Sequence, residues 1–340
     1  MPPNAPYIIA AVIAFGIMIM VHELGHFLVA KRVGITVYAF ALGFGPKLFG
    51  FQRGETHYSL NIIPFGGYVR MAGEDLDNAG GPGSFRTKSV WQRMAVVVAG
   101  PAMNLALSLV LLMTIALTVG VGATNRIGYL VPGWPAEQAG LRRGDAIVAI
   151  DGRSIQSGDD VIETIHARPD QDLMLTVERN GRRFEVMVRS RRDQTRNIGL
   201  IGFKPEAIRV GVGRALTWSI RTEVETVKVI FSALGGLLRE GRKMLTQLAG
   251  PIGAVRFLGE AGAAGAEIFI YTAAVLSIMI GVFNLLPIPA LDGGRLLFLA
   301  VEALRRRPVD ARREAYIHLV GFALLMLLLI RLTVFDLFRR

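Results

Sequence analysis

Four stretches of the chain are long and apolar enough to cross a bilayer, which takes about 20 mostly apolar residues as a helix. They are Tyr7–Ala30, Met94–Val119, Glu267–Leu286 and Ile317–Phe335. No basic residue precedes the first stretch, and its apolar run is too long for a cleaved signal peptide, so we expect it to remain in the protein. The pattern therefore predicts a polytopic α-helical membrane protein with four spans.

Between the second and third spans the pattern changes to short alternating runs separated by turn signals such as Asn180-Gly181. The strand-like runs are Ile127–Val131, Ala146–Ile150, Leu173–Arg179 and Phe184–Arg189, and Asp159–Ala167 reads as a helix. We therefore predict an inserted α/β module at 121–204 and a helical segment at 205–266. Within that segment Ala215–Leu238 is partly amphipathic and is expected to rest on the membrane face. The two membrane halves are then 1–120 and 267–340.

Basic residues in the short loops predict the orientation of the spans, because Lys and Arg gather on the cytoplasmic side. The loop after the first span carries Lys31, Arg32, Lys47, Arg53, Arg70, Arg86, Lys88 and Arg93, and the loop before the fourth carries Arg305, Arg306, Arg307, Arg312 and Arg313. Both loops are expected in the cytoplasm and the inserted module outside. Arg339 and Arg340 oppose this orientation, but the two loops outweigh them.

Composition agrees with a membrane protein: 52% of the residues are hydrophobic and the mean hydropathy is +0.43. The formal charge of +11 comes from dispersed residues without interleaved aromatics, so we expect contact with anionic lipid headgroups and none with nucleic acid. The chain has no cysteine, which excludes disulfides and cysteine–metal sites.

Candidate chemistry lies inside the first span, in the string His22-Glu23-Leu24-Gly25-His26. Residues at i and i+4 share one face of a helix, so both imidazoles can bind one zinc ion while Glu23 lies beside it as a general base. Two histidines of a packed core could share this spacing by chance. However, a carboxylate at mid-span costs about 2.5–3.5 kcal/mol, which favours a functional role for Glu23.

A catalytic zinc site needs a third protein ligand, and Asp292 is the best candidate. It ends the string Asn284-Leu-Leu-Pro-Ile-Pro-Ala-Leu-Asp-Gly-Gly, in which two prolines break the helix at membrane depth. The segment alone fits equally well a loop in which Asp292 caps a helix beginning near Arg295. Matching depth in the later halves of two parallel spans favours the ligand. His57, His166 and His318 read as ordinary surface or interfacial histidines.

Residues Thr56–Tyr68 begin with a strand-like alternation, with Tyr58, Leu60 and Ile62 on one face. We hypothesise that a strand edge near the metal holds a substrate in an extended form. A small membrane-associated hairpin within the cytoplasmic, β-rich loop 43–70 is the ordinary alternative.

These motifs, in order along nearly the whole chain, resemble the site-2 protease family of intramembrane zinc metalloproteases, in its bacterial form that regulates sigma-E. The matching strings begin at His22, Gly43, Pro64, Ala99, Gly250 and Asn284. The resemblance implies zinc held by His22, His26 and Asp292, Glu23 as catalytic base, and substrate contacts from Asn284. It also places Gly43, Phe44, Gly45, Gly66 and Gly67 near the substrate. The implied location is the bacterial inner membrane, with the active site near the cytoplasmic side. The implied substrates are single-span membrane proteins such as anti-sigma factors or signal-peptide remnants.

The inserted module, from Val131 to Gly152 above all, resembles a PDZ domain, and the resemblance implies a periplasmic location. A PDZ groove accepts a peptide C-terminus as an added strand, and we expect Gly128, Tyr129 and Leu130 to line it opposite the Asp159–Ala167 helix. A module that binds no peptide and filters substrates by size is equally open. The chain has room for one such domain, whereas the best-studied members of the family carry two.

Two other classes of function stay open. One is a membrane-anchored protease that cuts soluble or misfolded proteins, with Glu267, Glu302 or Glu314 as the third ligand. The other is a non-enzymatic scaffold that recruits partners through the PDZ-like module. Zinc content distinguishes the scaffold from both enzymes, and the position of cleavage distinguishes the two enzymes.

Overall fold

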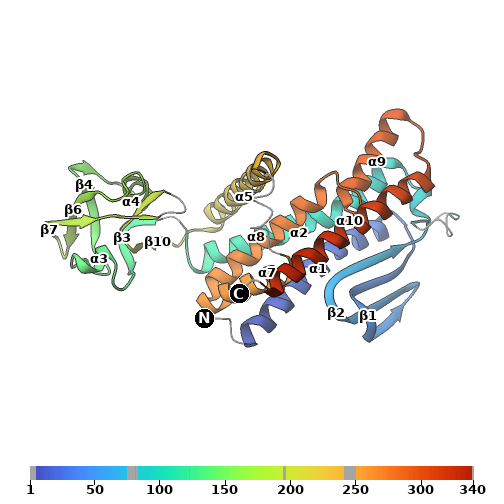
Figure 1. Ribbon diagram of the computed structural model, residues 1–340, viewed down its shortest axis with the longest axis horizontal. Coiled ribbons are helices and arrows are strands. Elements are labelled where there is room, and N and C mark those ends of the chain that lie inside the picture. The colour runs from blue at the N-terminus through green and yellow to red at the C-terminus, as the bar shows by residue number, and fades with distance from the viewer. Residues whose placement is uncertain are drawn as a thin grey trace. The chain divides into compact units, whose positions relative to one another are not determined.

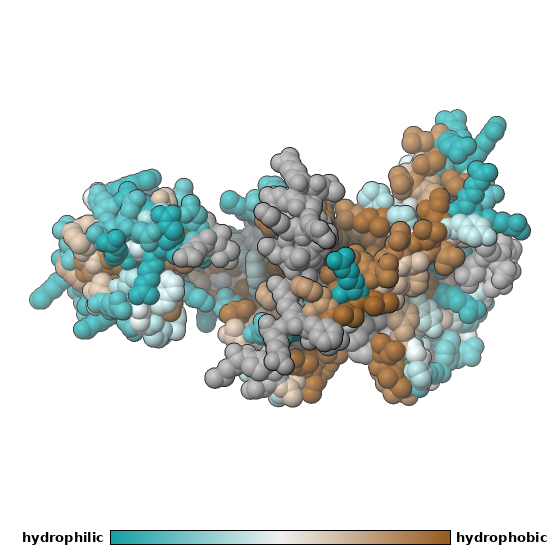
Figure 2. Space-filling model, viewed as in Figure 1, coloured by the Kyte–Doolittle hydropathy of each residue, from teal (hydrophilic) through white to brown (hydrophobic). Residues whose placement is uncertain are grey.

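The computed structural model describes residues 5–74, 81, 83–121, 123–193, 197–240 and 250–338. The chain forms two compact units: a helical unit of residues 1–112 and 219–340, and a PDZ-like unit of residues 113–218. The predicted module at 121–204 therefore lies within the second unit, which extends beyond it at both ends. Figure 2 shows a broad hydrophobic surface on the helical unit and a mostly hydrophilic surface on the PDZ-like unit.

The four predicted spans are all helical, which confirms a multi-pass membrane fold. They are α1 (Ala5–Arg32), α2 (Val90–Thr118), α8 (Ala266–Leu285) and α10 (Ala311–Phe338). Helix α1 continues past the apolar run to Lys31 and Arg32, and cations at a helix C-terminus are favoured by the helix dipole. Helix α8 ends at Leu285, two residues before Pro287, where the sequence predicts a break.

Three further helices complete the helical unit: α5 (Val212–Glu240), α7 (Pro251–Ala264) and α9 (Asp292–Arg305). The predicted helical segment at 205–266 contains α5 and α7 as separate helices. Val255 and Leu258 of α7 are buried against Ala11 and Met18 of α1, so α7 packs beside the first span. This packing was not visible in the sequence, because α7 has only 14 residues and is too short to cross a bilayer.

Two long strands, β1 (Val37–Arg53) and β2 (Thr56–Met71), form a ribbon beside α1 (Figure 1). Both strands bend where Gly43 and Gly66 adopt positive φ values of 84° and 115°, which side chains disfavour. The bend lets Ala39–Leu42 pair with Gly67–Arg70 on one edge and with His57–Leu60 on the other. Thus the predicted hairpin is present, and it folds back on itself.

The PDZ-like unit is built around a sheet of order β10-β3-β4-β6-β7, with β5 paired to β4. The strands are β3 (Ala123–Leu130), β4 (Ala146–Ile150), β5 (Arg153–Ser154), β6 (Asp172–Arg179), β7 (Arg182–Arg189) and β10 (Phe203–Ala207). A pair of short strands, β8 (Arg191–Asp193) and β9 (Ile198–Leu200), and two helices, α3 (Pro135–Gln138) and α4 (Gly158–His166), complete it. The predicted turn at Asn180-Gly181 joins β6 to β7, and both residues have positive φ. The core side chains come from β3, β4, β6 and α4, among them Ile127, Ile147, Leu175 and Val161.

Candidate metal centre and active-site cavity

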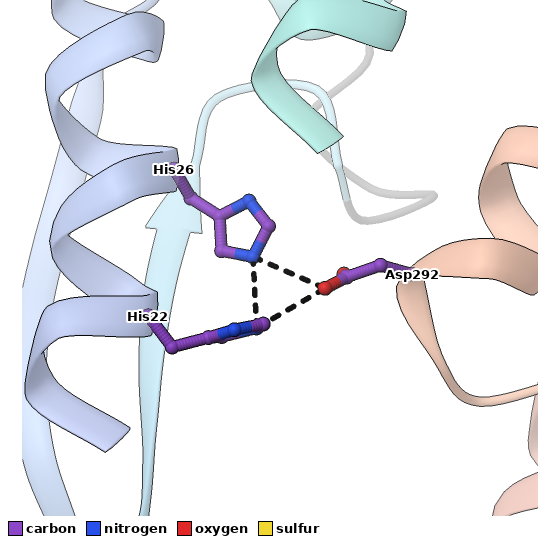
Figure 3. Close-up of side chains that lie close together, drawn as sticks. All are labelled: His22, His26 and Asp292. Carbon is purple, nitrogen blue, oxygen red and sulfur yellow. Dashed lines mark hydrogen bonds and ion pairs between the residues drawn. The ribbon is translucent and has the colours of Figure 1, made fainter. Parts of the chain in front are cut away.

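His22, His26 and Asp292 come together inside the helical unit (Figure 3). The two histidines lie one turn apart on α1, and Asp292 is the first residue of α9, 266 positions after His26. His22 Nε2 lies 3.2 Å from His26 Nε2 and 3.1 Å from Asp292 Oδ2, and His26 Nε2 lies 3.4 Å from the same oxygen. The sequence predicts this convergence, and the structure contains it.

The size of this triangle fits a zinc ion. With metal–ligand bonds of about 2.0–2.1 Å, two vertices of a tetrahedron are about 3.3 Å apart. The three measured distances lie on both sides of that value. Three ligand atoms occupy three vertices, and the fourth is the position that a catalytic site leaves open for water or substrate.

The hydrogen bonding around the triad favours metal binding. His26 Nδ1 lies 2.8 Å from the carbonyl oxygen of Val96, to which it can only donate, so the lone pair of Nε2 points to the other two ligands. Asp292 Oδ2 is buried, lies 3.1 and 3.4 Å from the two imidazole nitrogens, and has no hydrogen-bond donor among the described residues. Buried carboxylate oxygens without donors are costly unless a cation satisfies them.

Asp292 does not cap α9, which excludes the alternative that its segment left open. The N-cap residue is Leu291, and no side chain caps this helix end. Helix α9 therefore begins three residues earlier than the sequence suggests. Gly293 and Gly294 permit this start, because a Cβ at either position would lie within 2.5 Å of the carbonyl oxygens of Leu286 or Ile288.

Glycines from α2 and β2 leave room for the two functional side chains of α1. A Cβ on Gly100 would lie 2.2 Å from His26 Nε2, and a Cβ on Gly67 would lie 2.9 Å from Glu23 Cγ. Gly100 and Val96 are parts of the site that were not predicted from the sequence. The Ala99–Asn104 string was a signal for Gly100, whereas nothing in the sequence marks the backbone carbonyl of Val96.

A cavity of about 550 Å³ adjoins the triad and is lined by Glu23 together with all three candidate ligands. Asn284 lines it too, and its Nδ2 donates to the carbonyl of Ile280 at 3.0 Å, which leaves the second N–H of the amide for another acceptor. On the other side the cavity is bordered by Gly67, Tyr68, Val69 and Met71 of β2.

Comparison with known protein families supports a metallopeptidase site over most of the chain. Residues 10–328 match the family described as Peptidase family M50. The chain belongs to this family. It is therefore a metallopeptidase of the site-2 protease type.

Curated relatives of this M50 chain match it nearly end to end. It is 33% identical to the zinc metalloprotease RasP of Geobacillus kaustophilus, over 96% of this chain and 96% of the relative. It is 35% identical to a putative zinc metalloprotease of Clostridium perfringens, over 97% of this chain and 98% of the relative. It is 31% identical to the regulator of sigma-W protease RasP of Bacillus subtilis, over 98% of each chain. A solved PDZ domain from Listeria monocytogenes aligns with 25% of this chain and 90% of its own, at 17% identity and a TM-score of 0.23.

In this M50 member, the residues predicted to contact substrate separate into two groups. Asn284 and Gly67 line the cavity. Gly43, Phe44, Gly45 and Gly66 lie at the bends of the β1–β2 ribbon, where Phe44 stacks on Tyr68 with ring centroids 6.3 Å apart. Ile62 is 52% exposed and lies between Asn61 and Ile63, at the point where the strand pairing shifts. The strand edge at the cavity is therefore Gly67–Met71, at the end of the predicted Thr56–Tyr68 strand and beyond it.

Glu302 and Glu314, two alternatives to Asp292 as the third zinc ligand, lie beside arginines. Glu302 receives two hydrogen bonds from the guanidinium of Arg93, at 2.5 and 3.0 Å. Glu314 lines a neighbouring cavity of about 390 Å³ with Arg86 and Arg295. Among the described residues, the group with metal-ligand spacing is His22, His26 and Asp292.

The predicted peptide groove on β3 is wrong. Leu130, Tyr129 and Ile127 pair with Phe203, Lys204 and Pro205 of β10, so β10 occupies the edge that a peptide would need. On its other side β3 is bonded to the chain before β4, because the Ile127 N–H donates to the Asp145 carbonyl at 2.8 Å. On this side of the sheet the edge strand is β10, and β7 is the edge strand on the opposite side. Gly128 serves this pairing, since a Cβ there would lie 2.9 Å from Glu206 Cα.

Proposed function

We propose that this chain is a zinc-dependent intramembrane endopeptidase that cuts single-span membrane proteins within their spans. The observation that carries the proposal is the triangle of His22, His26 and Asp292, with edges of 3.1–3.4 Å, beside a cavity that also contains Glu23. Anti-sigma factors are the substrate class that the name of the Bacillus subtilis relative suggests, and signal-peptide remnants are a second class.

His22, His26 and Asp292 would hold the zinc ion, and Glu23 carries the proton. Zinc bound there supplies Lewis-acid activation of a water molecule and of the scissile carbonyl. The Glu23 carboxylate accepts the proton of the attacking water and then delivers it to the amide nitrogen, which leaves as an amine. Asn284, at the cavity wall, donates its second amide N–H to the substrate backbone or to the developing oxyanion.

The β2 edge at Gly67–Met71 receives the substrate in an extended form. A peptide bond inside a helix is shielded from attack, so a span must unwind before it is cut. Strand addition to a free edge stabilises an extended chain through main-chain hydrogen bonds. The segment Gly67–Met71 pairs with β1 on one side, and within the part of the chain that the structure describes no other strand pairs with its second side.

We place this enzyme in the bacterial inner membrane, with its PDZ-like unit in the periplasm and its active site near the cytoplasm. Basic residues in the loop between α1 and α2 and in the loop between α9 and α10 favour a cytoplasmic location for both loops. We place peptide recognition, if the PDZ-like unit performs it, on the open edge of β10 at Phe203–Ala207 instead of on β3. Cysteine-labelling from either side of sealed vesicles tests the orientation, since the native chain has no cysteine.

The function is tested with the purified full chain in detergent and a single-span reporter. Native protein should hold one zinc and cut within the reporter's span, as located by mass spectrometry. Glu23→Gln should keep the zinc and lose at least 100-fold in rate, because a general base contributes about 10²–10⁴-fold. Equal cleavage by both proteins would contradict the mechanism. Cleavage restricted to soluble segments would favour the rival protease, and absence of zinc would favour the scaffold.

A further inference from the structure

The turn that precedes Asp292 contains a residue with an uncommon backbone conformation. Ala290, two residues before Asp292, has a φ of +80°, a region that a residue with a side chain adopts only when its surroundings impose it. Pro289 before it cannot donate a backbone hydrogen bond. Something outside the turn must therefore hold Ala290 in place.

Helix α10 supplies that support through two residues on one face. The Ala290 N–H donates to Nδ1 of His318 at 3.0 Å. One turn later Pro289 rests on the α10 backbone at Gly321, where a Cβ would lie 2.4 Å from Pro289 Cβ. Positions 318 and 321 are three apart, so they face the same neighbour.

The bonding of His318 also fixes its tautomer. Because Nδ1 accepts the Ala290 N–H, the hydrogen of a neutral imidazole is on Nε2, which is buried and has no partner among the described residues. The ring is held from the other side by Phe298 of α9, with centroids 5.6 Å apart. His318 thus touches both the turn before Asp292 and the helix that Asp292 begins.

Helix α10 makes a second contact with the helical unit near its other end, where the Gly253 N–H donates to Asp336 at 2.8 Å. Every described side chain of α10 is at least partly exposed within the protein. The part-buried acceptor of His318 and the missing Cβ of Gly321 face the same two residues, Pro289 and Ala290, although α10 is not part of a densely packed core. His318 and Gly321 together support the turn at Pro289 and Ala290.

We propose that His318 is a positioning residue for the third zinc ligand: by accepting the Ala290 N–H, it holds the turn that aims the Asp292 carboxylate at His22 and His26. The proposal rests on the proposed zinc site. It adds that the geometry of this site depends on α10, which contributes no ligand.

The test measures zinc affinity of the full chain in detergent by competition with a chelator of known affinity. The variants are His318→Asn, His318→Gln and His318→Leu. Asn presents an oxygen at the same distance from Cβ as Nδ1, whereas the Gln oxygen is one bond farther and Leu has no acceptor. Asn should stay within about threefold of native. Gln and Leu should lose about 10–100-fold, the usual cost of removing a group that orients a metal ligand.

Two further variants separate positioning from general packing. Gly321→Ala should weaken zinc binding as His318→Leu does, because its Cβ displaces Pro289. Leu327→Ala, at a side chain 65% exposed on the same helix, should leave affinity unchanged. Thermal unfolding of the zinc-free proteins is measured in parallel, and His318→Leu should unfold there close to Leu327→Ala.

Each outcome decides one claim. If native protein binds no zinc, or if His22→Ala binds it as well as native, the proposed function fails. If native binds zinc through His22 but His318→Leu stays within twofold of Leu327→Ala, the positioning role alone fails. Equal losses in the Asn, Gln and Leu variants, matched by equal destabilisation of the zinc-free proteins, would also overturn it.

Discussion

Replacing Gly100 with alanine should remove zinc through a single added methyl group. The new Cβ would lie 2.2 Å from His26 Nε2, 2.5 Å from Cε1 and 2.8 Å from Cδ2. Ordinary contact begins at 3.4 Å, so the imidazole must retreat by about 1 Å or α2 must move away. Metal–ligand distances tolerate only about 0.2 Å. The 2.8 Å bond from His26 to the Val96 carbonyl would be strained by the same shift.

We expect Gly100→Ala to weaken zinc binding at least 100-fold, which corresponds to about 2.7 kcal/mol. Gly16→Ala on α1 is the matched control, because a Cβ there meets no atom within 4 Å. Both changes add one methyl group to a membrane helix and favour helix formation equally. Zinc affinity is measured by chelator competition, and reporter cleavage is followed alongside. Binding by Gly100→Ala within twofold of Gly16→Ala would refute the close approach of α2 to His26.

Three further outcomes follow from the contacts. Gly67→Ala, whose Cβ would lie 2.9 Å from Glu23 Cγ, should cut reporter turnover about 10-fold or more with zinc retained, because it shifts the general base and no ligand. Arg93→Met should lower the free energy of unfolding by about 2 kcal/mol, since it strands a largely buried Glu302, and adding Glu302→Gln should recover most of it in a thermal melt. Burial alone would raise the pKa of Asp145, but hydrogen bonds from Arg179 and from the Arg142 N–H lower it. These hydrogen bonds therefore stabilise the folded protein at pH values above 3.8, the pKa of the Asp carboxyl in the unfolded chain. The stabilisation is lost as the pH falls from there through the lowered pKa of Asp145 in the folded protein. Asp145→Asn should flatten the loss of stability below about pH 4, as followed by circular dichroism; an unchanged acid transition would count against the pair.

Much of the helical unit was predictable because its signals are local. A run of apolar residues predicts a span whatever lies elsewhere in the chain, and the spacing of His22 and His26 is imposed by the pitch of one helix. Two prolines after Asn284 likewise predict the end of α8. The turn at Asn180-Gly181 depends on two residues and was also predicted.

The failures concern pairings between distant segments. The sequence marks Ile127–Val131 as a strand but cannot say that β10, more than 70 positions later, covers its edge. Nothing in the sequence indicates that α7 packs on α1. The start of α9 was misplaced, because the approach of Gly293 and Gly294 to the end of α8 depends on backbone contacts that no residue pattern records.

By itself, the sequence determined which residues can bind a metal, which of them share a helix, and that this helix is long and apolar enough to span a membrane. Only the tertiary structure decided that Asp292 reaches both imidazoles, that Val96 and Gly100 hold His26 at its angle, and that α10 supports the turn from outside. The physical reason is that helical spacing follows from neighbours along the chain. The position of a third ligand depends on how separate helices pack, to within a few tenths of an ångström.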